Sequence, residues 1–364
     1  RSAARASPSR PGEAPPGRII PGIQAELKDL VLPYAEYTDE DVRQRHLYVE
    51  ASRGCPFKCE FCLSSLDKTA WPFELTRFLE ELETLHARGV RQFKFVDRTF
   101  NLKVDNSLAI LDFFLKKIEA APDDPPFVHF ELIPDHLPDR LKHSIAKFPD
   151  GTLQFEIGIQ TFDPEVQTRI SRRQNDEKAV ANLRWLREHS SAHLHVDLIA
   201  GLPGENVESF ARGFDALVAL APHEIQFGIL KRLRGAPIDR HTQAHDLRFN
   251  PDPPYNILST DVIDFATMQR LSRFSRYWDM VANSGRFVRT LPLLLGDAPF
   301  QRFLVFSDWL YGRTGQTHAI AHERMVHAVQ AFMTEEGGIG TEAANRALIE
   351  DYRGQGGRSR LTFE

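Results

Sequence analysis

The sequence predicts an α/β fold, a partial (β/α)6 barrel of parallel strands followed by a helical C-terminal region. From about Leu47 onward, short apolar strands alternate with amphipathic helices in units of about 30 to 45 residues. This alternation needs a parallel sheet, because a right-handed crossover helix returns the chain to the same edge. After about Pro254 the strand pattern fades and helical stretches take over. In such a barrel the chemistry is expected at the carboxyl ends of the strands.

Six segments have the composition of buried parallel strands. They are Leu47–Ala51, Gln92–Asp97, Phe127–Leu132, Leu153–Ile159, Leu194–Ile199 and Glu224–Leu230. Between them, apolar residues recur at helical spacing over residues 75–85, 108–118 and 210–217, and Gly89 is a plausible stop after the first of these helices.

Three parts are predicted along the chain. Residues 1–40 form a linker or disordered arm, because residues 1–21 are rich in Pro, Ala, Ser and Arg. Residues 41–253 form the barrel, and residues 254–364 form the helical region, with helices near 263–281, 300–310 and 318–332. The Gly- and Arg-rich segment 354–360 is predicted to be a frayed tail.

The composition argues against two classes of binding partner, nucleic acids and membranes. Lys and Arg number 45 against 50 Asp and Glu, a net charge of −5, which argues against a nucleic-acid partner. The sequence contains neither a run of about 18 apolar residues nor the apolar core of a signal peptide, so we expect a cytoplasmic protein with no membrane partner. The first residue is Arg1 and not Met, which suggests a processed or truncated product.

All three cysteines lie within eight residues, at Cys55, Cys59 and Cys62. A disulfide scaffold is therefore excluded, and three thiols so close can converge on one metal centre. A zinc site completed by a histidine is one alternative, but neither His46 nor His86 has a metal-ligand spacing to the loop. Three unliganded thiols are another. The position after the first strand favours a [4Fe–4S] cluster held by three thiolates, with one iron left open.

The CxxxCxxC spacing, with Phe61 before the last cysteine, resembles the radical S-adenosylmethionine (SAM) superfamily. The resemblance implies that the open iron chelates SAM, and that reduction by an external flavodoxin- or ferredoxin-type donor releases a 5′-deoxyadenosyl radical. It assigns Asp97 to the SAM amino group, Glu131 to the ribose hydroxyls and Arg172, or its neighbour Arg173, to the carboxylate. It also places Phe61 at the cofactor, and Gln160 and Asp197 at the ribose or methionyl part of SAM.

Two segments, residues 156–172 and 197–205, look like those of oxygen-independent coproporphyrinogen oxidase and Elongator-type radical SAM enzymes. Residues 50–68, 94–101 and 195–203 are most similar to radical SAM proteins with an N-terminal cobalamin-binding domain and a C-terminal domain of unknown function (DUF4080-like). That similarity implies a cobalamin-dependent methyltransferase in the full-length form. The DxHxxG signature of the cobalamin domain is absent from this sequence.

Other functions stay open. A cobalamin-free, coproporphyrinogen-oxidase-like oxidoreductase is one alternative, and an Fe–S sensor or scaffold is a non-enzymatic one. A tRNA methylthiotransferase-like enzyme would need further cysteines and a basic RNA-binding domain.

A small-molecule substrate has candidate partners in loops that follow strands. The candidate residues are Asp67, Lys68, Arg98, Asn101 and Lys231, of which Arg98 and Lys231 suit an anionic group. His193 and His195 alternate on one strand, so they share a face, and we expect them to line the barrel or to pack against a helix and not to bind a metal.

Overall fold

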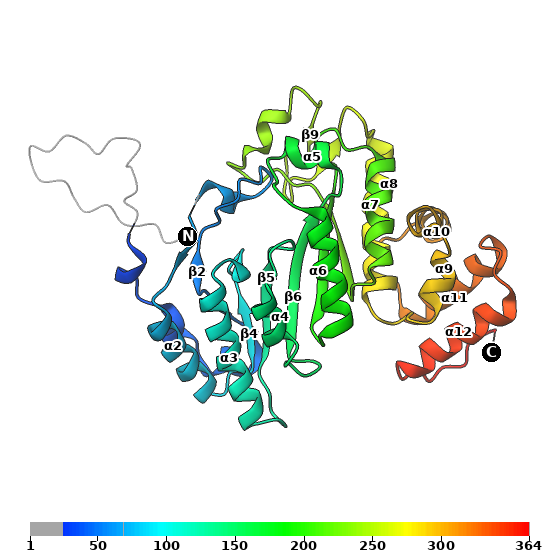
Figure 1. The fold of residues 1–364 in the computed structure, drawn as a ribbon. Helices are drawn as coiled ribbons and strands as arrows, with labels where there is room; N and C mark the ends of the chain where they lie inside the picture. Colours follow the sequence, from blue (N-terminus) through cyan, green and yellow to red (C-terminus); the bar gives the residue numbers. More distant parts are fainter. Residues whose placement is uncertain (1–24, 68, 364) are drawn as a thin grey trace, which may run out of the picture.

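The computed structural model describes residues 25–67 and 69–363. Its centre is a six-stranded parallel sheet in the order β1-β4-β5-β6-β7-β8, so β1 and β8 are its two edges (Figure 1). The strands are β1 (Leu47–Val49), β4 (Gln92–Phe95), β5 (Phe127–Leu132), β6 (Leu153–Gln160), β7 (His193–Ala200) and β8 (Glu224–Ile229). The predicted α/β class and the six predicted strands are confirmed.

One face of this sheet is apolar and is covered by helices. The covering helices are α2 (Leu75–Ala87), α3 (Val104–Ala120), α4 (Asp139–Ile145), α6 (Asp176–His189) and α7 (Val207–Ala219), whereas α5 (Pro164–Arg169) lies beyond the carboxyl ends of the strands (Figure 1). Phe93 and Phe95 of β4 both meet Phe114 of α3, with ring centroids 5.2 and 6.2 Å apart. Such contacts, repeated along the sheet, bury the inward stripe of each helix and hold the strands in place.

The opposite, concave face of the sheet is polar because side chains alternate along each strand. In β6 the residues from Leu153 to Ile159 at odd positions are buried, whereas Gln154, Glu156, Gly158 and Gln160 face the other side and are partly exposed. β7 and β8 repeat this alternation. The sheet therefore presents a row of polar side chains toward the inside of the partial barrel.

Short helices and strands precede the sheet, connect its first strands and follow its last strand. They are η1 (Leu27–Asp29), η2 (Pro33–Glu36), α1 (Asp39–Gln44), β2 (Ser52–Arg53), η3 (Leu63–Leu66), β3 (Trp71–Pro72), η4 (Phe100–Leu102), η5 (Pro237–His241), β9 (Arg248–Phe249) and β10 (Ile257–Ser259). Of the arm predicted over residues 1–40, residues 1–24 lie outside the described residues. The remainder differs from a disordered arm, since Tyr34 is buried against Phe78 of α2 with ring centroids 6.4 Å apart.

The region after the barrel is mostly helical, as predicted. It contains α8 (Phe265–Trp278), the π-helix η6 (Asp279–Asn283), α9 (Thr290–Leu295), α10 (Pro299–Thr314), α11 (His322–Glu335) and α12 (Thr341–Gly354). Phe300 and Phe303 of α10 pack on Phe274 of α8, with ring centroids 5.1 and 4.8 Å apart, so α8 and α10 are joined by an aromatic core. Helices α11 and α12 lie beyond α10, at the far end from the first strands (Figure 1).

The segment predicted to be a frayed tail, residues 354–360, is largely exposed, but the residues that follow it pack against the helical region. Leu361 is only 1% exposed, the Phe363 carbonyl accepts a hydrogen bond from Asn345 Nδ2 at 3.0 Å, and the Thr362 N–H donates to His327 Nε2 at 3.3 Å. The chain therefore returns to α11 and α12 after the Gly- and Arg-rich segment. Within the described residues, none of the helices combines the length and apolarity needed to cross a bilayer.

The free edge of β8 is covered by side chains. The Asn283 amide accepts from the Ile225 N–H and donates to the Ile225 carbonyl, both at 3.0 Å, so it pairs with the strand as a neighbouring backbone would. Eight residues earlier, in α8, Ser275 Oγ donates to the Phe227 carbonyl at 2.6 Å. Helices α8 and η6 thereby satisfy backbone groups that an edge strand otherwise leaves open.

Candidate active site

The three cysteines lie in a loop framed by a short antiparallel pair of strands. Ser52 and Arg53 of β2 pair with Pro72 and Trp71 of β3, and the Cys55 N–H donates to the Asp67 carbonyl at 3.1 Å. Gly54 has φ +90°, and a side chain there would collide with the Thr69 carbonyl. Only glycine allows this close crossing of the two ends of the loop.

The middle of the loop is tied to two distant segments through its backbone. The Glu60 N–H donates to the Ile170 carbonyl at 3.0 Å, and the Glu60 carbonyl accepts from the Ile238 N–H at 2.9 Å. A turn also closes between the Cys62 N–H and the Cys59 carbonyl at 3.1 Å. The cysteine spacing is therefore held by the surrounding fold.

All three cysteines line one cavity of about 210 Å³ at the carboxyl ends of the strands. Of the side chains predicted to bind SAM, five line the same cavity: Phe61, Glu131, Gln160, Arg172 and Asp197. They come from the cysteine loop, from β5, β6 and β7, and from the segment after α5. The carboxyl face of a parallel barrel brings together residues from separate parts of the chain in this way.

Asp97 is the exception among these predictions. Its side chain does not line the cavity, and the residue is 2% exposed. It accepts hydrogen bonds from the Ala51 N–H at 2.9 Å and from Ser52 Oγ at 2.6 Å, directly before the cysteine loop. Burial raises its pKa to about 6. The structure therefore places Asp97 as a support of the cysteine loop, behind the cavity wall.

Arg172 reaches a cysteine sulfur. Its Nη1 lies 3.6 Å from Cys59 Sγ, while its other guanidinium nitrogens bond to Gln174 Oε1 and to the Gly158 carbonyl. Gln160, at the bulge between β6 and β7, has φ 71°, a backbone conformation unusual for a residue with a side chain. Arg173 also lines the cavity, so both arginines considered from the sequence are present there.

Glu131 is paired with one of the candidate substrate residues. Arg98 Nη1 lies 2.6 Å from Glu131 Oε1, and both side chains line the cavity. Burial raises the pKa of Glu131 to about 7, and the Arg98 guanidinium opposes this rise. Arg98 thus sets the charge of the carboxyl group that is predicted to face the SAM ribose.

The other candidate substrate residues lie elsewhere. Asn101 is fully buried and bonds to backbone groups of Ile133 and His136, so its amide holds the loop after β5 and does not reach the cavity. Lys231 lines a second, polar groove along β8. Asp67 Oδ1 closes a local turn with Thr69 at 2.5 Å. Lys68 lies outside the described residues.

Glu156 and Gln174 line the cavity but were not singled out from the sequence. Glu156 lies 3.9 Å from Lys94 Nζ and 3.4 Å from His129 Nε2, and the hydrogen bond with His129 and the charge of Lys94 lower its pKa. Gln174 bonds Arg172 and Asp176. Glu156 could have been found from the alternation in β6, since it shares a face with Gly158 and Gln160. No comparable periodicity marks Gln174.

The thiols fit a metal cluster by their chemistry and their common cavity. Burial raises the pKa of the Cys55 and Cys59 thiols, and Arg172 acts in the opposite direction on Cys59. In the described part of the chain, no three His, Cys, Asp or Glu side chains converge closely enough to hold a single metal ion. A four-iron cluster bonds each thiolate to a different iron, so its ligands need not meet at one point.

Two segments of the chain match known protein families. Residues 49–217 match the Radical SAM superfamily, and residues 243–360 match the family described as a protein of unknown function (DUF4080). Neither description names a cobalamin-binding domain.

Curated relatives cover part of the chain. The ribosomal protein uS12 methylthiotransferase RimO of Pseudothermotoga lettingae is 27% identical over 214 residues, 55% of this chain and 50% of that protein. Coproporphyrinogen III oxidase, anaerobic 1, of Cereibacter sphaeroides is 37% identical over 76 residues, 21% of this chain and 17% of that protein. The chain spans about half the length of the RimO relative.

Among solved structures, the cobalamin-dependent SAM radical enzyme OxsB with aqua-cobalamin bound has a TM-score of 0.52 at 13% identity, covering 86% of this chain and 59% of that chain. The radical SAM methyltransferase TsrM from Kitasatospora setae has a TM-score of 0.48 at 20% identity, covering 57% and 42%. The OxsB likeness extends the shared fold over most of the chain. The family matches show that the chain carries a radical SAM domain over residues 49–217, followed by a DUF4080 domain over residues 243–360.

Proposed function

We propose that the chain holds a [4Fe–4S] cluster through Cys55, Cys59 and Cys62 and binds SAM beside it. The observation that carries this proposal is that the three thiols and five side chains predicted to bind SAM line one cavity. When bound, the reduced cluster supplies the electron that cleaves SAM to methionine and a 5′-deoxyadenosyl radical.

The charges in the cavity suit this ligand. SAM carries an ammonium group, a carboxylate, a sulfonium cation and a ribose diol. The cavity is lined by three arginines, Arg98, Arg172 and Arg173, and by the acidic residues Glu131, Glu156 and Asp197 among others. A mixture of both signs stabilises a zwitterionic ligand better than a cavity of one sign would.

Each side chain has a distinct task in this proposal. An arginine fork, from Arg172 or Arg173, binds the carboxylate, and the two oxygens of Glu131 accept hydrogen bonds from the ribose hydroxyls. Asp197 and Gln160 orient the rest of the ligand from the concave face. The ring of Phe61, which lines both the cavity and the neighbouring groove along β8, separates the two spaces.

Anaerobic reconstitution with iron and sulfide tests the proposal. We expect about four irons per chain and, with dithionite in place of the biological one-electron donor, formation of 5′-deoxyadenosine from SAM. Cys59→Ala should lose the cluster, whereas Lys58→Ala, an exposed neighbour in the same loop, should keep it. The proposal fails if iron-replete, reduced wild-type protein forms no 5′-deoxyadenosine.

We further propose methyl transfer with cobalamin as the methyl carrier. The RimO relative, a methylthiotransferase, supports group transfer at carbon, and the DUF4080 match supports membership of the cobalamin-associated group suggested by the sequence. Product analysis separates this reaction from the oxidative alternative suggested by the coproporphyrinogen oxidase relatives. A methyltransferase forms S-adenosylhomocysteine from SAM when cobalamin is supplied, whereas an oxidase forms none.

A further inference from the structure

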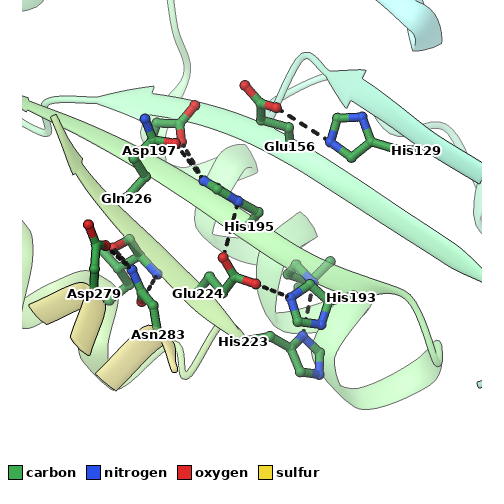
Figure 2. Close-up of polar contacts among 12 residues, drawn as sticks. His129, Glu156, His193, His195, Asp197, His223, Glu224, Gln226, Asp279 and Asn283 are labelled. Carbon is green, nitrogen blue, oxygen red and sulfur yellow. Dashed lines mark hydrogen bonds and ion pairs between the residues drawn. The ribbon is translucent and has the colours of Figure 1, made fainter. Parts of the chain in front are cut away.

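A chain of ionisable side chains runs along the concave face from the SAM cavity toward the amino ends of β7 and β8 (Figure 2). Asp197 Oδ1 lies 3.2 Å from His195 Nε2. Glu224 Oε2 lies 3.4 Å from His195 Nδ1, and Glu224 Oε1 lies 2.9 Å from His193 Nε2. His195 is therefore the link between Asp197, which lines the SAM cavity, and Glu224, which lines the groove along β8.

The surroundings of His195 favour its doubly protonated form. Each ring nitrogen faces a carboxylate oxygen, and Nε2 also lies 2.8 Å from Gln226 Oε1. A neutral imidazole has one N–H and could satisfy only one of these sides, whereas the imidazolium cation has two. Burial disfavours the cation, but the bonds to Asp197 and Gln226 and the charge of Glu224 outweigh it and raise the pKa of His195 to about 9.

The charged groups that act on His195 from the neighbouring strands and from η6 are acidic. Glu156 faces it from β6, Glu224 from β8 and Asp279 from η6, in addition to Asp197 on its own strand. Two cations, Lys231 and Arg276, line the same groove as His195. Arg172 acts on Asp197 in the same direction as His195, since both lower the pKa of this carboxyl group. Losing the proton of His195 would remove one of these two favourable interactions.

The Asp197 carboxylate needs a positively charged partner to keep its orientation. Its Oδ1 is buried and makes no hydrogen bond of good geometry, so the 3.2 Å contact with His195 is what compensates this oxygen. We propose that His195 is a positioning residue that holds the Asp197 carboxylate in the SAM cavity, so that SAM binding weakens when His195 loses its proton. This inference rests on the proposed function, because it takes Asp197 as a SAM contact.

Strand β7 offers a matched control. His193 lies two residues from His195 on the same face and contacts the same Glu224, but the bonds that position Asp197 come from His195. His193→Gln therefore removes an imidazole from the cluster without removing the partner of Asp197. His195→Gln removes the positive charge beside Asp197 and replaces a side chain that titrates with one that does not.

The experiment measures SAM dissociation constants by calorimetry on the cluster-loaded, unreduced full chain, from pH 7 to pH 10. For His195→Gln we expect binding about tenfold weaker than wild type at pH 7, the loss of a charge-assisted contact, and a difference that closes by pH 10. His193→Gln should follow the wild-type curve. The SAM ammonium titrates alike in all three proteins, so only the difference between curves reports His195.

Two results would overturn the inference alone: equal SAM affinities for wild type and His195→Gln at pH 7, or an equal loss in His193→Gln. If His195→Gln does not fold, His195→Asn takes its place in the same comparison with the wild-type and His193→Gln curves, so the difference between curves still reports His195. Wild-type protein that holds the cluster but binds no SAM at any pH would instead overturn the proposed function, on which the inference rests.

Discussion

Oε2 of Glu60 lies 2.7 Å from Nε2 of His241, although the two residues are 181 positions apart in the chain. Ser171 Oγ donates to the other oxygen of Glu60 at 2.5 Å, and the Arg240 guanidinium bonds to that oxygen as well. The Glu60 side chain is only 3% exposed. A carboxylate between two cysteines thus binds two separate segments of the protein and fixes the loop from behind.

Replacing Glu60 by alanine should loosen the cysteine loop. The substitution leaves His241 and Ser171 without their partner in a buried setting, which we expect to cost about 2 kcal/mol of unfolding free energy. The same variant should retain less iron per chain after reconstitution. Thermal unfolding and iron analysis measure both effects, with Glu188→Ala, an exposed residue of α6, as the control. Wild-type stability and iron content in Glu60→Ala would contradict this role.

Glu205 should make stability depend on pH. It is 2% exposed and accepts from Thr161 Oγ1 at 2.5 Å, and burial raises its pKa to about 8 from an ordinary value of 4.5. Between these two pH values the unfolded chain is ionised and the folded one protonated, so stability falls as pH rises from 4.5 to 8.

The variant Glu205→Gln cannot ionise, so it tests that slope. Relative to wild type, its unfolding free energy should rise by at least about 1 kcal/mol between pH 5.5 and pH 8, since each pKa unit is worth about 1.4 kcal/mol. Urea denaturation at the two pH values measures the difference. A difference that stays constant between them would show that Glu205 does not titrate in this range.

Gly201 should resist substitution more than a glycine of similar backbone conformation. It has φ +87°, and a methyl group there would lie 2.6 Å from Ile257 Cγ2 and 3.1 Å from Met268 Cε. Gly235 has φ +90° with open space around it. Both alanine variants pay for the backbone conformation, and Gly201→Ala should lose a further 1–3 kcal/mol, approximately, through overpacking. Equal unfolding midpoints for the two variants would argue against the close contact.

Arg98 should control the pH range of SAM binding through Glu131. Removing the guanidinium that lies 2.6 Å away raises the pKa of Glu131 further above its value of about 7, so that the carboxyl group is protonated at neutral pH. For Arg98→Ala we expect SAM affinity to rise by roughly tenfold between pH 6.5 and pH 8.5 as Glu131 ionises. The double variant Arg98→Ala with Glu131→Gln should lack this rise, and its persistence there would assign the effect to another group.

The sheet could be predicted from the sequence because alternation and helix spacing repeat six times. The same alternation places Glu156, Gln160 and Asp197 toward the concave face. Of the cavity residues found from family resemblance, Glu131, Gln160 and Asp197 lie on strands, where the chain order of the barrel fixes their position.

Contacts that depend on distant segments could not be predicted. Glu60 has no local signal, because its partners are more than a hundred residues away. Asp97 lies two residues after the end of β4, and its carboxylate accepts hydrogen bonds from the Ala51 N–H and the Ser52 hydroxyl, which hold it behind the cavity wall. Leu361 and Phe363 are only two apolar residues, too short a pattern to indicate that this end of the chain packs.

The amide of Asn283 has a consequence for association between molecules. An exposed edge strand is a template on which another chain can add a strand and begin to aggregate. A strand approaching β8 would first have to displace Asn283 from both backbone groups of Ile225 and Ser275 from Phe227. Two side chains, one on the π-helix and one on α8, therefore protect the open edge of the partial barrel at β8 from pairing with a strand of another molecule.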